Sequence, residues 1–162
     1  MQISLLLLLS FLALCLAKNH GLDSSTCSSV LCTTFQNELG STMQIADVSN
    51  GFFAGTYQTA VGKAKGKYRL VGSYSGETLP ATIGWTITWS NSNTPTNSPI
   101  TTTSWTGVIT LGSAQNCKST NTCDADTLYL ITQWHLSTPT TPQNYWQSTL
   151  SGMDLFSNST SY

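Results

Sequence analysis

The chain has 162 residues, of which 8% are charged, and its 6 basic and 7 acidic side chains give a formal net charge of -1 at pH 7. A nearly neutral protein lacks the basic surface that nucleic-acid binding requires, so a nucleic-acid partner is not expected. The length fits one globular domain.

The first 17 residues form a short apolar run that ends in small residues. This pattern is typical of a secretory signal peptide, with cleavage expected after Ala17. The run is too short for a confident membrane span, and no later segment is apolar enough to cross a bilayer. We therefore expect a secreted, extracellular protein whose mature chain begins at Lys18.

Four cysteines remain after the signal segment is removed, namely Cys27, Cys32, Cys117 and Cys123. Secretion exposes them to an oxidising compartment, in which thiols pair. Four cysteines allow three connectivities, and the spacing does not choose among them. We favour the two local pairs, Cys27–Cys32 and Cys117–Cys123. The sequence has no paired C-x-x-C motifs, which argues against a metal site.

Residues 18–32 form a polar, irregular N-terminal arm, residues 33–156 a strand-rich domain, and residues 157–162 a C-terminal tail. The tail contains an N-glycosylation acceptor at Asn158. Runs rich in strand-forming residues, separated by turn residues, predict eight strands: Thr33–Asn37, Met43–Val48, Phe53–Ala60, Tyr68–Ser75, Ile83–Ser90, Thr101–Thr110, Thr127–Ser137 and Trp146–Phe156. Their order predicts an all-β fold, either an eight-stranded antiparallel up-and-down β-barrel or a sandwich.

Alternation along the strands assigns side chains to the two faces of the sheet. Ile83, Trp85, Ile87 and Trp89 share one apolar face, which should be the interior. The same parity on other strands turns a mixed set inward: Tyr57, Thr59, Thr101, Thr103, Trp105, Trp134, Leu136 and Asp154. Apolar walls with a few convergent polar groups are typical of a small-molecule site.

An enzyme is not supported by this set of residues. His135 is predicted to face outward, so no inward histidine is available as a base, and the sequence has no G-x-S-x-G motif. A glycosidase needs two flanking carboxylates, and the interior offers only Asp154. A lipocalin-like carrier of apolar ligands would bury that carboxylate at high cost.

Six segments, in order, resemble motifs of the avidin/streptavidin family. They are Asn37–Ser41 (NELGS), Gly55–Val61 (GTYQTAV), Gly84–Trp89 (GWTITW), Thr103–Gly107 (TSWTG), Gln133–Leu136 (QWHL) and Trp146–Phe156 (WQSTLSGMDLF). The resemblance covers residues 33–156 and implies an eight-stranded barrel that binds biotin, with no metal or other cofactor, as a homotetramer.

The resemblance also implies a role for each matching residue. Three donors, Asn37, Ser41 and Tyr57, would bind the ureido oxygen of biotin, while Thr59 and Asp154 would accept from its two N–H groups. Thr103 would meet the thioether sulfur, and the loop after Val61 would close over the valerate tail. Trp89, Trp105 and Trp134 would wall the pocket, and Trp146 would reach into the pocket of a neighbouring subunit. The full expected set is Asn37, Ser41, Tyr57, Thr59, Lys63, Trp89, Thr101, Thr103, Trp105, Trp134, Leu136 and Asp154, with Trp146 from the neighbour.

Two features depart from the family pattern. Phe35 stands where the family has a tryptophan, which predicts a modest loss of packing. Four of the chain's basic residues lie between Lys63 and Arg69. We expect Lys65 and Lys67 to be solvated, whereas Lys63 is either solvated or paired with the valerate carboxylate.

The sequence therefore predicts a secreted, high-affinity biotin-binding protein that sequesters biotin, with a role in antimicrobial defence implied by the family alone. The alternative is an avidin-like secreted structural or storage barrel that has lost tight biotin binding.

Overall fold

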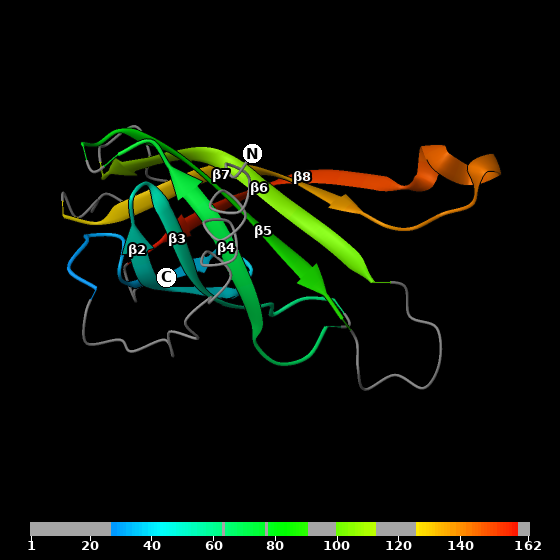
Figure 1. Ribbon diagram of the computed structural model, residues 1–162, viewed down its shortest axis with the longest axis horizontal. Coiled ribbons are helices and arrows are strands. Elements are labelled where there is room, and N and C mark those ends of the chain that lie inside the picture. The colour runs from blue at the N-terminus through cyan, green and yellow to red at the C-terminus, as the bar shows by residue number, and fades with distance from the viewer. Residues whose placement is uncertain (1–26, 63, 77, 91–99, 113–125, 159–162) are drawn as a thin grey trace, which may run out of the picture.

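The computed structural model describes residues 27–62, 64–76, 78–90, 100–112 and 126–158. Eight antiparallel strands pair in sequence order and β8 returns to β1, which closes the barrel (Figure 1). The strands are β1 (Thr34–Asn37), β2 (Thr42–Ser49), β3 (Phe52–Gln58), β4 (Tyr68–Tyr74), β5 (Ala81–Trp89), β6 (Thr101–Leu111), β7 (Leu128–Ser137) and β8 (Thr149–Ser157). The predicted up-and-down barrel is confirmed, and the sandwich is wrong.

The tight connections use residues that tolerate positive φ. Asn50 and Gly51, between β2 and β3, have φ of 51° and 79°, and two-residue hairpins of this kind favour an Asn-Gly pair. The predicted third strand was too long at its end, because β3 stops at Gln58. The hydroxyl of Thr59 bonds to both backbone groups of Val61, which turns the chain away from the sheet.

The barrel interior is apolar at one end. Ala81, Ile109 and Leu130 are cross-strand neighbours there, and all three are buried. The expected inner face of β5 is confirmed, because the side chains from Ile83 to Ile87 with this parity are buried and Trp89 is half-buried. Phe35 is fully buried in the core. The packed end forms a fixed floor beneath the more polar half of the interior.

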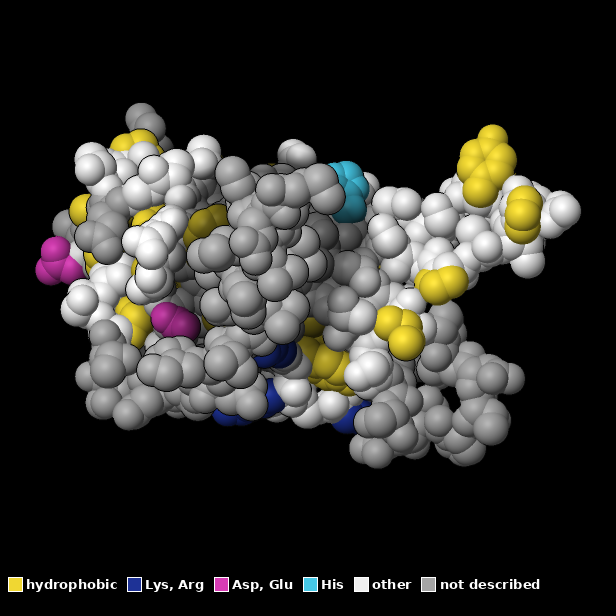
Figure 2. Space-filling view, viewed as in Figure 1, with side chains coloured by type: hydrophobic (Ala, Val, Ile, Leu, Met, Phe, Trp, Pro, Cys, Tyr) yellow, Lys and Arg dark blue, Asp and Glu magenta, His cyan; other side chains and the backbone are white. Residues whose placement is uncertain are grey.

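The β7–β8 hairpin projects well beyond the rest of the barrel (Figure 1). Its tip is a 3-10 helix, η1 (Pro142–Gln147), so the prediction that Trp146 begins the last strand is wrong. Proline near the start of a helical turn has a preset φ and needs no N–H partner, which favours this turn over a strand. Tyr145 and Trp146 are exposed, and hydrophobic side chains stand out at this tip in Figure 2.

A disulfide joins Cys27 and Cys32, whose Cα atoms are 5.9 Å apart, so this local pair is confirmed. Next to it, Leu31 is buried in the core and ties the preceding segment to the barrel. Cys117 and Cys123 lie outside the described residues. Within the described ranges, no helix has the length and hydropathy of a membrane span. The same ranges contain no group of three or more His, Cys, Asp or Glu side chains placed to hold a metal ion.

Candidate functional site

A cavity of about 440 Å³ opens at the polar end of the barrel. This volume lies within the range of small-molecule pockets. The residues that line it come from six strands and two turns: Asn37, Leu39, Ser41, Tyr57, Thr59, Val61, Gly62, Ala64, Trp89, Thr101, Thr103, Trp105, Trp134, Leu136 and Asp154. The cavity therefore gathers the expected inward set in one place.

The turn after β1 orients the amide of Asn37. Its Oδ1 accepts hydrogen bonds from the backbone N–H groups of Leu39 (3.1 Å) and Ser41 (2.8 Å). Gly40 completes the turn with φ of 83°. Because the amide oxygen is used by the backbone, the Nδ2 group remains a donor at the cavity wall, and it counteracts part of the rise in the pKa of Asp154.

Ser41 and Tyr57 place two hydroxyl groups close together. The Oγ of Ser41 accepts from the backbone N–H of Ala60 at 3.0 Å, which leaves the Ser41 proton free to donate. Burial raises the pKa of the Tyr57 hydroxyl above its usual range, and the Ser41 hydroxyl lowers that pKa in part through its hydrogen-bonding capacity. Tyr57 therefore keeps its proton at neutral pH and can act as a donor.

Among the described residues that line the cavity, Asp154 is the one carboxylate, and only 7% of its surface is exposed. Its Oδ2 accepts from the indole N–H of Trp105 at 2.8 Å. Burial raises the pKa of this carboxyl, and hydrogen bonds from Trp105, Asn37 and Trp134 partly offset the rise. The bond from Trp105 thus holds an ionisable acceptor in place, as a buried carboxylate requires.

The aromatic wall is also tied by a hydrogen bond. The indole N–H of Trp89 donates to Oγ1 of Thr103 at 2.7 Å, so the Thr103 hydroxyl proton points elsewhere. The Trp89 ring meets Tyr57 edge to face, with centroids 5.8 Å apart, and Trp105 at 6.5 Å. Such edge-on pairs stabilise the orientation of each ring.

Trp134 reaches the carboxylate because a glycine lies beneath it. A Cβ atom added to Gly152 would lie 2.4 Å from Cζ2 of the Trp134 indole, far inside van der Waals contact. The two residues are cross-strand partners on β7 and β8. The absence of a side chain at Gly152 therefore lets the indole lie flat against β8, two residues before Asp154.

The structure brings together eleven of the twelve expected residues of this subunit at the cavity, since Lys63 lies outside the described residues. Trp146 is remote from the cavity lining and lies in η1. Thr59 is at the rim rather than on a strand. Its hydroxyl donates to the carbonyl of Val61 and keeps lone-pair capacity to accept.

Four lining residues were missed by sequence reasoning as individual contacts: Leu39, Val61, Gly62 and Ala64. They come from the two turns rather than from strands, so the alternation of inward and outward positions could not find them. The family resemblance predicts that the loop after Val61 closes over the ligand, and this prediction was the one indication that residues of this turn line the cavity.

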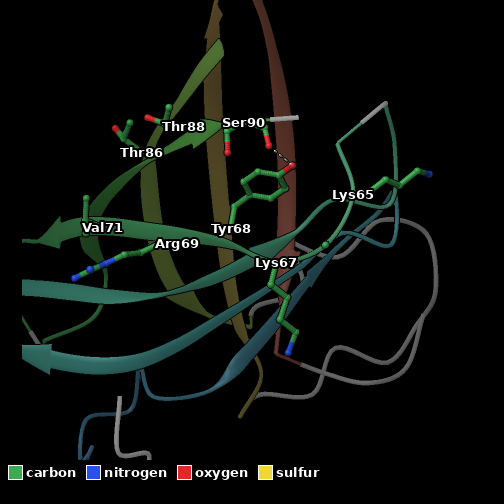
Figure 3. A pocket seen from close by; sticks show the side chains of 9 residues that line it. Lys65, Lys67, Tyr68, Arg69, Val71, Thr86, Thr88 and Ser90 are labelled. Atoms are coloured by element: carbon green, nitrogen blue, oxygen red, sulfur yellow. Dashed lines mark hydrogen bonds between the residues drawn. The ribbon is translucent and has the colours of Figure 1, made fainter. Parts of the chain in front are cut away.

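A second hollow, of about 520 Å³, lies on the outer face of β4 and β5. It is lined by Lys65, Lys67 and Arg69 together with threonine and serine hydroxyls. Figure 3 shows the three basic side chains pointing in three different directions. The hydroxyl of Tyr68 donates to the carbonyl of Ser90 at 3.3 Å, the single bond drawn between these residues. Because its charges diverge, this hollow does not present a converging set of donors.

The inner cavity can complement a flat polar group that carries one acceptor oxygen and adjacent N–H donors. Hydroxyl and amide donors stand at one side, and the Asp154 carboxylate stands as the acceptor. Indole rings enclose the rest and exclude water, which strengthens each of these hydrogen bonds. The described residues that line the cavity include no histidine, the usual base of nucleophilic catalysis.

Comparison with known proteins agrees with this architecture. Residues 25–159 match the sequence model of the Avidin family. A crystal structure of xenavidin superposes with a TM-score of 0.62 at 29% identity, covering 80% of this chain and 96% of that one. The X-ray structure of a biotin-binding protein from chicken gives the same TM-score and coverage at 23% identity, and this likeness shows the fold alone. Proteins of the avidin family bind biotin and are not enzymes. Since the family model spans most of the sequence, the chain belongs to the avidin family.

Proposed function

We propose that this protein binds biotin in the cavity at the open end of the barrel. The observation that carries the proposal is the pairing of one buried acceptor, Asp154, with the donor groups of Asn37, Ser41 and Tyr57 in the same cavity. A ureido group has a negative oxygen and two N–H groups. Donors on the oxygen and a carboxylate on an N–H polarise it in the same direction, and charge-assisted bonds of this kind are the strong ones.

The remaining contacts follow from this placement. Thr59 accepts from the second ureido N–H, and the free hydroxyl proton of Thr103 is directed to the thioether sulfur. Trp89, Trp105 and Trp134 bury the bicyclic ring, with Leu136 and Thr101 beside them. Because the partners are already held by bonds within the protein, binding orders few groups and its entropic cost is low.

We further propose that the site is completed by a second subunit of a homotetramer. Trp146 is 69% exposed at the tip of a hairpin that extends from its own barrel. An exposed indole in such a position favours burial against a partner. A second, smaller contact would use Gln133, Ser151 and Met153, which are neighbours on the outer face of β7 and β8.

The mature protein is proposed to start at Lys18 after signal cleavage, to be secreted and to sequester biotin. Glycosylation is proposed at Asn158. The side-chain oxygen of Asn158 accepts from the backbone N–H of Leu128 at 2.8 Å, which leaves the nitrogen to which a glycan attaches.

Calorimetric titration of the purified protein with biotin tests the proposal. The wild type should bind one biotin per chain, and Asp154→Ala should lose affinity by roughly 30-fold or more, because truncating a buried charged partner costs several kcal/mol. Asp47→Ala is the matched control, since Asp47 is an exposed carboxylate on β2. Absence of binding by the wild type would leave the alternative of a structural or storage barrel.

The role of Lys63 has its own test. If Lys63 pairs with the valerate carboxylate, Lys63→Ala should weaken biotin more than a biotinylated amine, whose carboxylate is blocked. Equal weakening of the two ligands would show that Lys63 is simply a solvated residue of the loop.

A further inference from the structure

The seam between β1 and β8 is short, and it ends beside Asp154. Only two residue pairs join these strands, Gln36 with Ser157 and Asn37 with Phe156, whereas β7 and β8 pair along nine positions. The next pair in this register would be Glu38 with Leu155, but β1 has already ended. The backbone that carries Asp154 therefore lies where β8 loses its neighbour on one side.

A side chain takes the place of the missing strand at this point. Oε2 of Glu38 accepts a hydrogen bond from the backbone N–H of Leu155 at 2.9 Å. The donor and acceptor are 117 positions apart in sequence, so the bond crosses the closing seam of the barrel. It satisfies the N–H that would otherwise be the first unpaired donor along the open edge of β8.

The other side of the same peptide unit is also held by a side chain. Oγ1 of Thr132 donates to the carbonyl oxygen of Asp154 at 3.0 Å. This carbonyl and the N–H of Leu155 belong to one planar peptide group, so the two bonds pull it from opposite sides of the strand. Thr132 is buried on the inner face of β7, where its hydroxyl has few alternative partners.

We propose that Glu38 and Thr132 form a clamp on the Asp154–Leu155 peptide group and that this clamp positions the Asp154 carboxylate for the ligand. Glu38 is exposed and does not line the cavity, so it is a positioning residue rather than a contact. The proposal rests on biotin binding in this cavity. Fixing the backbone of Asp154 matters because its carboxylate must meet a ligand N–H while it accepts a hydrogen bond from Trp105.

If the clamp exists, position 38 requires a side chain with an oxygen that can accept a hydrogen bond. Glu38→Gln keeps an oxygen that can accept from Leu155, whereas Glu38→Ala removes the acceptor. We expect biotin dissociation to accelerate on the order of tenfold in Glu38→Ala, the usual scale for one hydrogen bond to a charged group at a partly exposed site. Glu38→Gln should stay within about threefold of the wild type, since neutral amides accept more weakly than carboxylates.

A double-mutant cycle shows whether the effect passes through Asp154. In an Asp154→Ala background, Glu38→Ala should change the dissociation rate by less than about twofold, because the positioned group is gone. Thr132→Val keeps the shape of the side chain and removes the donor. Like Glu38→Ala, it should accelerate biotin dissociation in the wild type and have little effect in the Asp154→Ala background. Equal acceleration in both backgrounds, or a Glu38→Gln variant as fast as Glu38→Ala, would overturn the clamp.

Hydrogen exchange of the Leu155 amide tests the clamp without biotin. Measured by NMR on the ligand-free protein, this amide should be protected in the wild type and in Glu38→Gln and should exchange at least about tenfold faster in Glu38→Ala. Asp47→Ala is the control for loss of an exposed acid. Unchanged exchange in Glu38→Ala would refute the clamp even if biotin binds, whereas a wild type that fails to bind biotin would refute only the proposed function.

Discussion

The barrel carries two hollows of similar volume, and they differ in how their polar groups are held. The inner cavity measures about 440 Å³ and the outer one about 520 Å³. Inside, each indole N–H of Trp89 and Trp105 has a partner within 2.8 Å, and the groups face a common centre. Outside, Lys65 and Lys67 are exposed and point apart (Figure 3). Volume and charge alone therefore do not distinguish a binding site on this molecule.

The polar groups of the two hollows differ in how far they are already removed from water and already fixed in one conformation before a ligand binds. A carboxylate that is nearly enclosed and already hydrogen-bonded, as Asp154 is, loses little freedom when a ligand arrives. A long basic side chain in water must lose both hydration and rotamer freedom to make one contact. The inner cavity should consequently respond strongly to small changes, and the outer hollow should tolerate large ones.

Gly152→Ala should give the largest loss, although it adds one methyl group. The new Cβ would overlap the Trp134 indole and push it from β8, which displaces one wall of the cavity. We expect biotin affinity to fall on the order of a hundredfold or more, because strain from overpacking adds to the lost contacts. Calorimetry measures the affinity, and a change in tryptophan fluorescence should accompany it.

A second substitution separates this clash from a general loss of folding. In Gly152→Ala/Trp134→Phe the smaller ring should accommodate the methyl group, so thermal stability should recover toward that of Trp134→Phe alone. If the double variant is as unstable as Gly152→Ala, the indole is not what the methyl group meets.

Two stacked indoles provide the next test. The rings of Trp85 and Trp105 lie 5.6 Å apart and nearly parallel. Trp105 donates to Asp154, whereas the buried N–H of Trp85 has no hydrogen-bond partner among the described residues. Trp105→Phe should weaken biotin binding by roughly 10- to 100-fold, since it removes a hydrogen bond to a charged group. Trp85→Phe should change binding by less than about threefold, because the N–H that it removes makes no hydrogen bond within the described part of the chain and lies outside the cavity lining. Equal losses in titrations of the two variants would contradict the distinction.

Strand periodicity and turn residues were sufficient to predict the barrel, because its inner face alternates regularly. Ile83, Trp85 and Ile87 fix the parity of β5, and Asp154 follows the same rule on β8. The end of the hairpin could not be found in this way. Trp146 lies in a short helical turn that begins at Pro142, and local turn geometry overrides the strand preference of an aromatic residue there.

The hydrogen bonds of the site were harder to predict from the sequence than the residues that line the cavity. Asn37 was expected at the cavity, but the use of its oxygen by the backbone depends on the fold of the turn. The bond from the Leu155 N–H to the Glu38 carboxylate joins residues that are 117 positions apart. Such contacts depend on barrel closure and register, which no local pattern contains.

The pH dependence of binding should follow the carboxyl of Asp154. Burial raises its pKa above the ordinary value of 3.8, and the nearby carboxylate of Glu38 adds a smaller upward push. Biotin needs the ionised form as acceptor, so affinity should fall as pH drops through the raised pKa. Calorimetry across acid pH measures this loss, and Asp154→Asn should remove most of the pH dependence.

The stability of the ligand-free protein should have the opposite pH dependence to biotin affinity. The folded state binds the Asp154 proton more tightly than the unfolded state, so this group's contribution to stability is greatest at low pH and is lost as pH rises through the raised pKa. Asp154→Asn should therefore raise the melting temperature at neutral pH while it weakens biotin. A lower melting temperature for the ligand-free variant would contradict the assigned cost of burying this charge.

The smallest effects are expected in the outer hollow. Lys67→Ala and Arg69→Ala each remove a charge whose side chain lies outside the barrel and away from the cavity lining. We expect biotin affinity to stay within about twofold, because exposed charges interact weakly through water and salt. Titration at low and at physiological salt gives the measurement, with wild type alongside. A larger loss confined to low salt would mean that long-range attraction of the biotin carboxylate contributes to binding, and the outer charges would then act on the inner cavity without forming a site of their own.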